Sequence, residues 1–201
     1  MRLPVKVIHT GYERPEHILS KMERNMSILE QELVENPDVF TLRFLYANNL
    51  VYFNRFEEAQ EYYLGVVNTP GARDTQGDVY YGALVAMAHT HIQLNNYIEA
   101  ERWACRAVED RPQSLQGWHQ WGKALAYMNQ GDAALDKYYR ALACKNTISS
   151  VQVDYSGLKI SCLESAVTIL ITQNRHKEAE DLLQEELRKG AVPRISDLLD
   201  R

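Results

Sequence analysis

The sequence of 201 residues has little of what marks a membrane protein, a secreted protein or a nucleic-acid-binding protein. It contains no run of about 18 apolar residues and no signal peptide, so no segment is expected to cross a bilayer. Its three cysteines, Cys105, Cys144 and Cys162, are widely spaced and predict neither a disulfide framework nor a zinc site. Acidic residues outnumber basic ones, 27 against 22, and the net charge of −5 argues against a nucleic-acid partner. We therefore expect a cytoplasmic protein whose thiols stay reduced.

The sequence is equally poor in motifs that carry catalysis. Its 10 glycines are scattered, and it has no nucleophile elbow, phosphate-binding loop, zinc-protease helix or dinucleotide-binding fingerprint. His89 and His91 stand two residues apart, a spacing that turns two helical side chains to different faces and disfavours a shared metal ion. We predict that this chain holds no cofactor and is not by itself a catalyst.

What the sequence does contain is a repeat. Four segments consist of a turn with asparagine, then an acidic residue and then alanine, at residues 54–59, 95–100, 129–134 and 174–179. The alanines that end these segments are separated by 41, 34 and 45 residues. The middle spacing equals the period of tetratricopeptide (TPR) repeats. The two longer intervals contain the Gly, Pro, Ser and Asn clusters that are typical of loops.

The residues between the turns resemble the TPR family. In the third repeat the match is carried by Trp118, Trp121, Gly122 and Leu125 in a first helix and by Ala134, Tyr138 and Ala141 in a second. The resemblance implies an all-α, right-handed solenoid of about four helical hairpins over residues 38–190. The repeats are expected near 39–72, 80–113, 114–147 and 159–192. Small residues such as Ala47, Ala88 and Gly122 are expected where the two helices of a hairpin touch.

The TPR resemblance also implies where a partner binds. In that family the first helix of each repeat lines the concave side of the solenoid, where a protein or an extended peptide lies. The predicted groove residues are Thr41, Phe44, Asn48 and Tyr52, then Val85, His89 and Ile92, then Gln116, His119, Lys123 and Tyr127, and finally Glu164 and Thr168. A clamp for a C-terminal carboxylate is not expected, because Phe44 stands where that clamp has lysine and His89 where it has asparagine.

The first residues do not follow the repeat. Residues 3–8 alternate and are rich in β-branched side chains, which predicts a strand. A single strand has no partner in an all-α chain, so we interpret residues 1–14 as the remnant of an upstream domain. Residues 15–37 predict a junction helix that caps the solenoid, with an apolar stripe at Ile18, Met22, Met26, Leu29 and Leu33.

This junction resembles that of bacterial family-two glycosyltransferases with C-terminal TPRs. The resemblance rests on His9-Thr10-Gly11-Tyr12, Lys21, Arg24-Asn25, Leu29-Glu30 and Asn36-Pro37. It implies a parent enzyme that uses a divalent metal and a nucleotide sugar, with His9 as the only candidate metal residue in this chain. The alternative is a free-standing cytoplasmic TPR adaptor. Residues 191–201 are expected to form a tail or a partial helix. The sequence does not decide between a monomer and a homo-oligomer.

Overall fold

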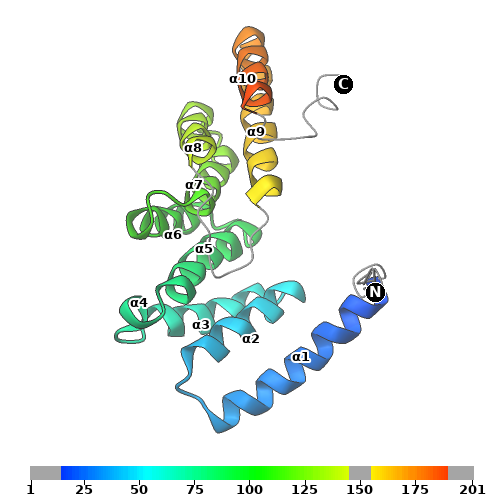
Figure 1. The fold of residues 1–201 in the computed structure, drawn as a ribbon, viewed down its shortest axis with the longest axis vertical. Coiled ribbons are helices and arrows are strands. Elements are labelled where there is room, and N and C mark those ends of the chain that lie inside the picture. The colour runs from blue at the N-terminus through cyan, green and yellow to red at the C-terminus, as the bar shows by residue number, and fades with distance from the viewer. Residues whose placement is uncertain (1–14, 145–154, 190–201) are drawn as a thin grey trace, which may run out of the picture.

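The computed structural model describes residues 15–144 and 155–189, and every regular element in these ranges is a helix (Figure 1). The helices are α1 (Pro15–Glu35), α2 (Phe40–Tyr52), α3 (Phe56–Val67), α4 (Ala72–Thr75), α5 (Gly77–Gln93), α6 (Tyr97–Asp110), α7 (Leu115–Tyr127), α8 (Gly131–Ala143), α9 (Tyr155–Thr172) and α10 (His176–Arg188). The predicted all-α solenoid is confirmed. The strand predicted at residues 3–8, His9 and the tail at 191–201 lie outside the described residues.

Four helical hairpins follow one another, and each is closed by the same turn. The hairpins are α2 with α3, α5 with α6, α7 with α8 and α9 with α10. At each turn an asparagine has positive φ, at 57°, 59°, 58° and 58° for Asn54, Asn95, Asn129 and Asn174. In the first turn the N–H of Arg55 donates to the carbonyl of Leu50 at 2.9 Å, and the other three turns repeat this bond. This is a Schellman motif, in which asparagine tolerates the left-handed position better than most residues.

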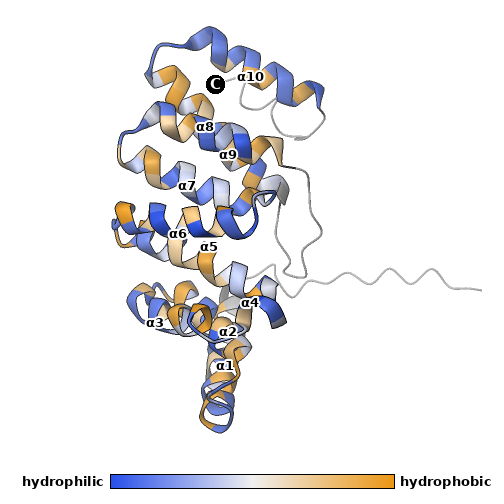
Figure 2. Ribbon diagram, turned by 90° about the vertical axis from the view of Figure 1, so that its left-hand side faces the viewer, coloured by the Kyte–Doolittle hydropathy of each residue, from blue (hydrophilic) through white to orange (hydrophobic). Residues whose placement is uncertain are grey.

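Neighbouring hairpins stack so that the first helices lie on the inner side of the curve. Each second helix packs against the first helix of the next hairpin, and the first helices α2, α5, α7 and α9 also contact one another in sequence. Among the described residues the second helices make no comparable contacts with each other. The first helices are therefore at the smaller radius, and the hairpins follow one another along the long axis of the molecule (Figure 2).

Small residues allow the close approach of helices within each hairpin. Ala47, Ala59, Ala88 and Ala100 are fully buried. A Cβ atom added at Gly122 would lie 2.8 Å from the ring of Tyr138, so any side chain there would force α7 and α8 apart. The expectation that a small residue lies where the two helices of a hairpin touch is confirmed at Gly122, whose missing side chain leaves room for the ring of Tyr138.

The first and the last described helix each bury an apolar stripe against the neighbouring helix. Helix α1 packs on α2 through Met26, Leu29 and Leu33, as the apolar stripe predicts. Helix α10 buries Ala179, Leu182 and Leu183, and its outer face is polar (Figure 2). A polar outer face suits a helix that has water on one side. No helix in the described residues is long and apolar enough to cross a membrane.

Candidate functional site

One residue from each of the four first helices forms a row on the inner face. Asn48, His89, Lys123 and Thr168 each lie six residues before the asparagine of their turn, so the repeat places them at equivalent positions. Asn48 and Thr168 are exposed, whereas His89 and Lys123 are half-buried. We call these four residues the inner row. The amide of Asn48, the imidazole of His89 and the ammonium of Lys123 can each donate a hydrogen bond, and the hydroxyl oxygen of Thr168 can accept one, so the row can accompany a polar chain across the hairpins.

The neighbours of the inner row fix its chemistry. The hydroxyl of Tyr63 donates to the Oδ1 atom of Asn48 at 2.7 Å, which orients that amide. Burial lowers the pKa of His89, and the nearby ammonium of Lys123 lowers it further. His89 therefore stays neutral near pH 7 and offers one donor and one acceptor. The charge of the row is concentrated at Lys123.

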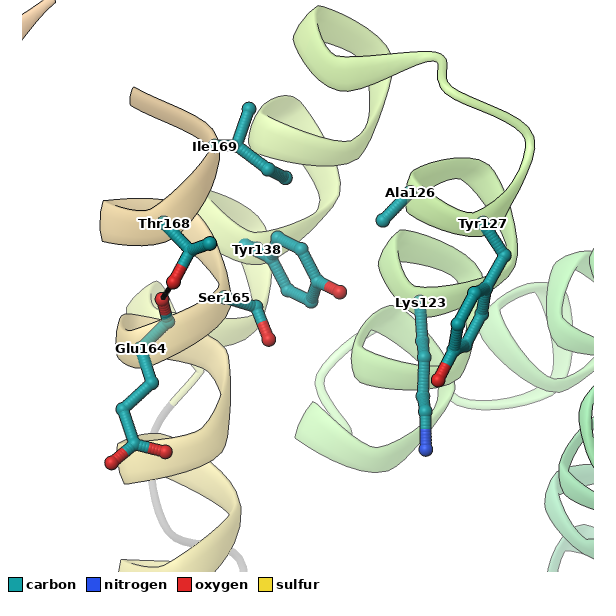
Figure 3. Close-up of a pocket in the computed structure, with 8 residues that line it drawn as sticks. All are labelled: Lys123, Ala126, Tyr127, Tyr138, Glu164, Ser165, Thr168 and Ile169. Atoms are coloured by element: carbon teal, nitrogen blue, oxygen red, sulfur yellow. Dashed lines mark hydrogen bonds between the residues drawn. The ribbon is translucent and has the colours of Figure 1, made fainter. Parts of the chain in front are cut away.

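The inner face is hollowed between α7 and α9 (Figure 3). The hollow has a volume of about 340 Å³, which is within the range of small-ligand sites. Its lining residues are Lys123, Ala126 and Tyr127 of α7, Tyr138 of α8, and Glu164, Ser165, Thr168 and Ile169 of α9. Burial raises the pKa of Tyr138 to about 12, so its hydroxyl stays protonated and acts only in hydrogen bonds.

Two opposite charges stand on the two walls of this hollow. Lys123 rises from α7 and Glu164 from α9, and their charged ends point away from the hollow's interior at its mouth (Figure 3). Neither side chain forms an ion pair with another described residue. The hydroxyl of Thr168 donates to the carbonyl of Glu164 at 2.8 Å and so follows the helix backbone. Both charges are therefore available to a partner.

The structure separates the thirteen predicted groove residues into three groups by exposure. Asn48, Tyr52, Tyr127, Glu164 and Thr168 are exposed. Thr41, Val85, His89, Gln116 and Lys123 are half-buried. Phe44, Ile92 and His119 are buried at 7%, 4% and 7% exposure. Four of the thirteen, Lys123, Tyr127, Glu164 and Thr168, come together at the hollow.

The three buried residues correct the predicted groove. Phe44 covers Gly82 of α5, where an added Cβ would lie 2.8 Å from its ring. Ile92 is buried against Ala100 and Ala124. The exposed residue that follows His89 one helical turn later is Gln93. The Nε2 atom of His119 shares a hydrogen bond of 3.2 Å with the Oγ atom of Ser161.

His119 is the least ordinary of these buried groups. Burial lowers its pKa to about 4, and the positive charge of Lys123 and the neighbouring imidazole of His89 lower it further. Its Nδ1 atom is buried and has no hydrogen-bond partner. The neutral ring is consequently a core group that holds α7 against α9. The prediction that His119 lies on the groove surface was wrong.

Four lining residues were missed by the sequence interpretation. Ala126, Ser165 and Ile169 lie next to predicted groove residues on the same helices. Including the residues directly before and after each predicted groove residue would have found these three. Tyr138 reaches the hollow from a second helix, and its TPR core position gave no such signal.

The described residues contain no group of three or more His, Cys, Asp or Glu side chains that could hold a metal ion. His9, the single metal candidate from the sequence, lies outside the described ranges. A second hollow, of about 500 Å³, lies between α1 and the first hairpin, lined by residues such as Arg43 and Tyr62. None of the thirteen predicted groove residues lines it.

No family model matches the sequence, and no curated protein matches it either. Several solved structures share the fold. MamA superposes with a TM-score of 0.66 at 12% identity, covering 92% of this chain and 96% of that one. BtubC from P. vanneervenii superposes with a TM-score of 0.66 at 18% sequence identity, covering 90% of this chain and 75% of BtubC. YrrB, a TPR protein with an unusual peptide-binding site, superposes with a TM-score of 0.57 at 17% identity, covering 85% of this chain and 78% of YrrB. The chain thus has the helical-hairpin fold of TPR proteins.

Proposed function

We propose that this chain is a protein-binding module that holds an extended segment of its partner along the inner row. The observation that carries the proposal is the row itself, in which Asn48, His89, Lys123 and Thr168 occupy one repeat position in four successive first helices. An extended chain needs polar side chains at regular intervals, because its own backbone groups must be hydrogen-bonded when they leave water. The likeness to YrrB, which has a peptide-binding site, supports the proposal.

The test is affinity capture with the full chain and a double variant of the row, Lys123→Ala with Thr168→Ala. Both side chains reach the surface, and neither bonds to another side chain among the described residues, so the fold should stay intact. Asn48 is avoided because its loss would leave the hydroxyl of Tyr63 unsatisfied. The control with the same change of charge is Lys177→Ala with Gln184→Ala on the exposed face of α10.

We expect a protein captured by the native chain and by the α10 control to be lost or weakened about tenfold with the row variant. Thermal unfolding should show the same midpoint for all three proteins. A partner that binds the row variant and the native chain equally well would refute the inner row as the binding surface.

The wider context remains a prediction from the sequence. Placement behind the catalytic domain of a bacterial glycosyltransferase rests only on the resemblance of residues 3–40 to that junction. The described structure and the comparisons add nothing to it. Reading the gene upstream of the codon for Met1 tests it, because a catalytic domain with an Asp-x-Asp motif in frame is expected there. An upstream stop codon would instead favour the free-standing adaptor.

A further inference from the structure

We propose that the hollow between α7 and α9 is a specificity pocket for one apolar side chain of the bound segment, flanked by one acidic and one basic side chain. The inference rests on the proposed function and specifies the chemistry of the partner. The partner segment would place its acidic group at Lys123 and its basic group at Glu164. The apolar side chain between them would enter the hollow.

The lining of the hollow fits an apolar side chain. Ala126 and Ile169 contribute hydrocarbon from the two opposing helices, and Tyr127 stands as a half-exposed ring at one wall (Figure 3). Tyr127 is held in place by Tyr97, whose ring is stacked on it at 5.1 Å. A wall that is already fixed loses little conformational entropy when a ligand arrives. The volume of about 340 Å³ is large enough for a leucine or an aromatic side chain.

The two charges at the mouth define the flanking residues. Lys123 and Glu164 are on opposite walls, and within the described ranges neither has an ion-pair partner (Figure 3). A ligand with the opposite charges satisfies both, whereas a ligand with two like charges is repelled at one wall. In an extended chain, side chains two residues apart point the same way. The charged residues of the partner are therefore expected two positions before and two positions after the apolar one.

This spacing makes the proposal testable with four fluorescent peptides whose ends are blocked. Each peptide has serine and glycine at all positions except a central leucine and the two residues at plus and minus two. These two residues are Glu and Lys, Lys and Glu, two Glu, or two Lys. Binding to the full chain is measured by fluorescence anisotropy. We expect one or both mixed-charge peptides to bind about fivefold tighter than either like-charged peptide, since a partly exposed ion pair contributes about 1 kcal/mol.

Charge reversal in the protein should then change the preference. With Lys123→Glu the doubly basic peptide is expected to bind best, and with Glu164→Lys the doubly acidic peptide. The matched controls Lys177→Glu and Glu180→Lys carry the same changes on the exposed face of α10 and should keep the native preference. Thr168→Trp, which fills the mouth from an exposed position, should abolish binding of all four peptides.

Three results would overturn the inference. The first is a preference that Lys123→Glu leaves unchanged. The second is equal binding of a mixed-charge peptide in which serine replaces the central leucine. The third is no binding of any peptide at 1 mM. If the capture experiment on the inner row succeeds while the peptides fail in one of these ways, the proposed function stands and the pocket chemistry is refuted.

Discussion

Two contacts between first helices use the same repeat positions with different side chains. The N-terminal seam is where α2 meets α5, and the C-terminal seam is where α7 meets α9. At the N-terminal seam the ring of Phe44 lies over Gly82. At the C-terminal seam the equivalent residues are His119 and Ser161, which share a hydrogen bond of 3.2 Å. Next to this polar pair the inner face is hollowed by about 340 Å³.

The difference shows which properties belong to the repeat and which belong to single residues. The repeat decides the direction of a side chain, because equivalent residues are at equal distances from the turn asparagine. The residue type decides whether that direction leads to an apolar contact, a buried polar pair or an open site. The seams can therefore be distinguished by substitutions at equivalent positions.

The largest effect is expected from Phe44→Ala at the N-terminal seam. Phe44 is buried, and its ring also packs against Tyr63 with the ring centroids 5.9 Å apart. Removing a buried phenylalanine ring loses its hydrophobic contacts and leaves a cavity, so the free energy of unfolding should fall by about 3–5 kcal/mol. Urea unfolding followed by circular dichroism measures this loss.

Gly82 provides the control for that seam. In the native chain Gly82→Ala should destabilise by about 1–2 kcal/mol, because the new methyl group would meet the Phe44 ring at 2.8 Å. In the Phe44→Ala background the same change should be neutral or stabilising, because alanine is the better helix former. Equal effects in both backgrounds would show that the ring does not occupy the space above Gly82.

The seams also mark what the sequence could predict. The hairpins follow from the spacing of Ala59, Ala100 and Ala134, because a small residue must recur where helices touch. The cap helix follows from its apolar stripe and from Asn36-Pro37 at its end. The burial of Phe44 and His119 could not be predicted in this way. It depends on which side chain of the next hairpin faces each of them, and a single repeat does not contain that information.

The next largest effect is a pH dependence that comes from the C-terminal seam. The pKa of His119 is lowered to about 4 by burial, and the positive charge of Lys123 and the neighbouring His89 add to the shift. The unfolded chain therefore binds a proton near pH 6.5 that the folded chain does not bind. The stability contributed by the neutral ring is complete above about pH 6.5 and declines as the pH falls toward 4. This decline should reach about 2–3 kcal/mol.

His119→Gln isolates this contribution. Glutamine can keep a hydrogen bond to Ser161 but does not titrate, so the stability of the variant should decline less between pH 6.5 and 4.5 than that of the native chain. Urea midpoints at several pH values measure the two slopes. Other groups that titrate in this range, such as His89 and His91, are present in both proteins, so the difference between the two slopes reports the ring of His119 together with its electrostatic coupling to His89. Identical slopes would mean that the ring of His119 can be protonated in the folded state.

The smallest effect should be the same next to both seams, because it concerns the turn that all four hairpins share. Asn54 and Asn129 have φ values of 57° and 58°, a conformation that costs most residues about 1 kcal/mol. Asn54→Ala and Asn129→Ala should each lower the free energy of unfolding by about that amount, and the corresponding glycine variants should change it by a few tenths of a kcal/mol. Thermal unfolding of the four variants measures the comparison. If alanine were costly at only one of the two turns, the turns would also contribute to the difference between the two seams. The side chains at the seams would then not be the sole origin of that difference.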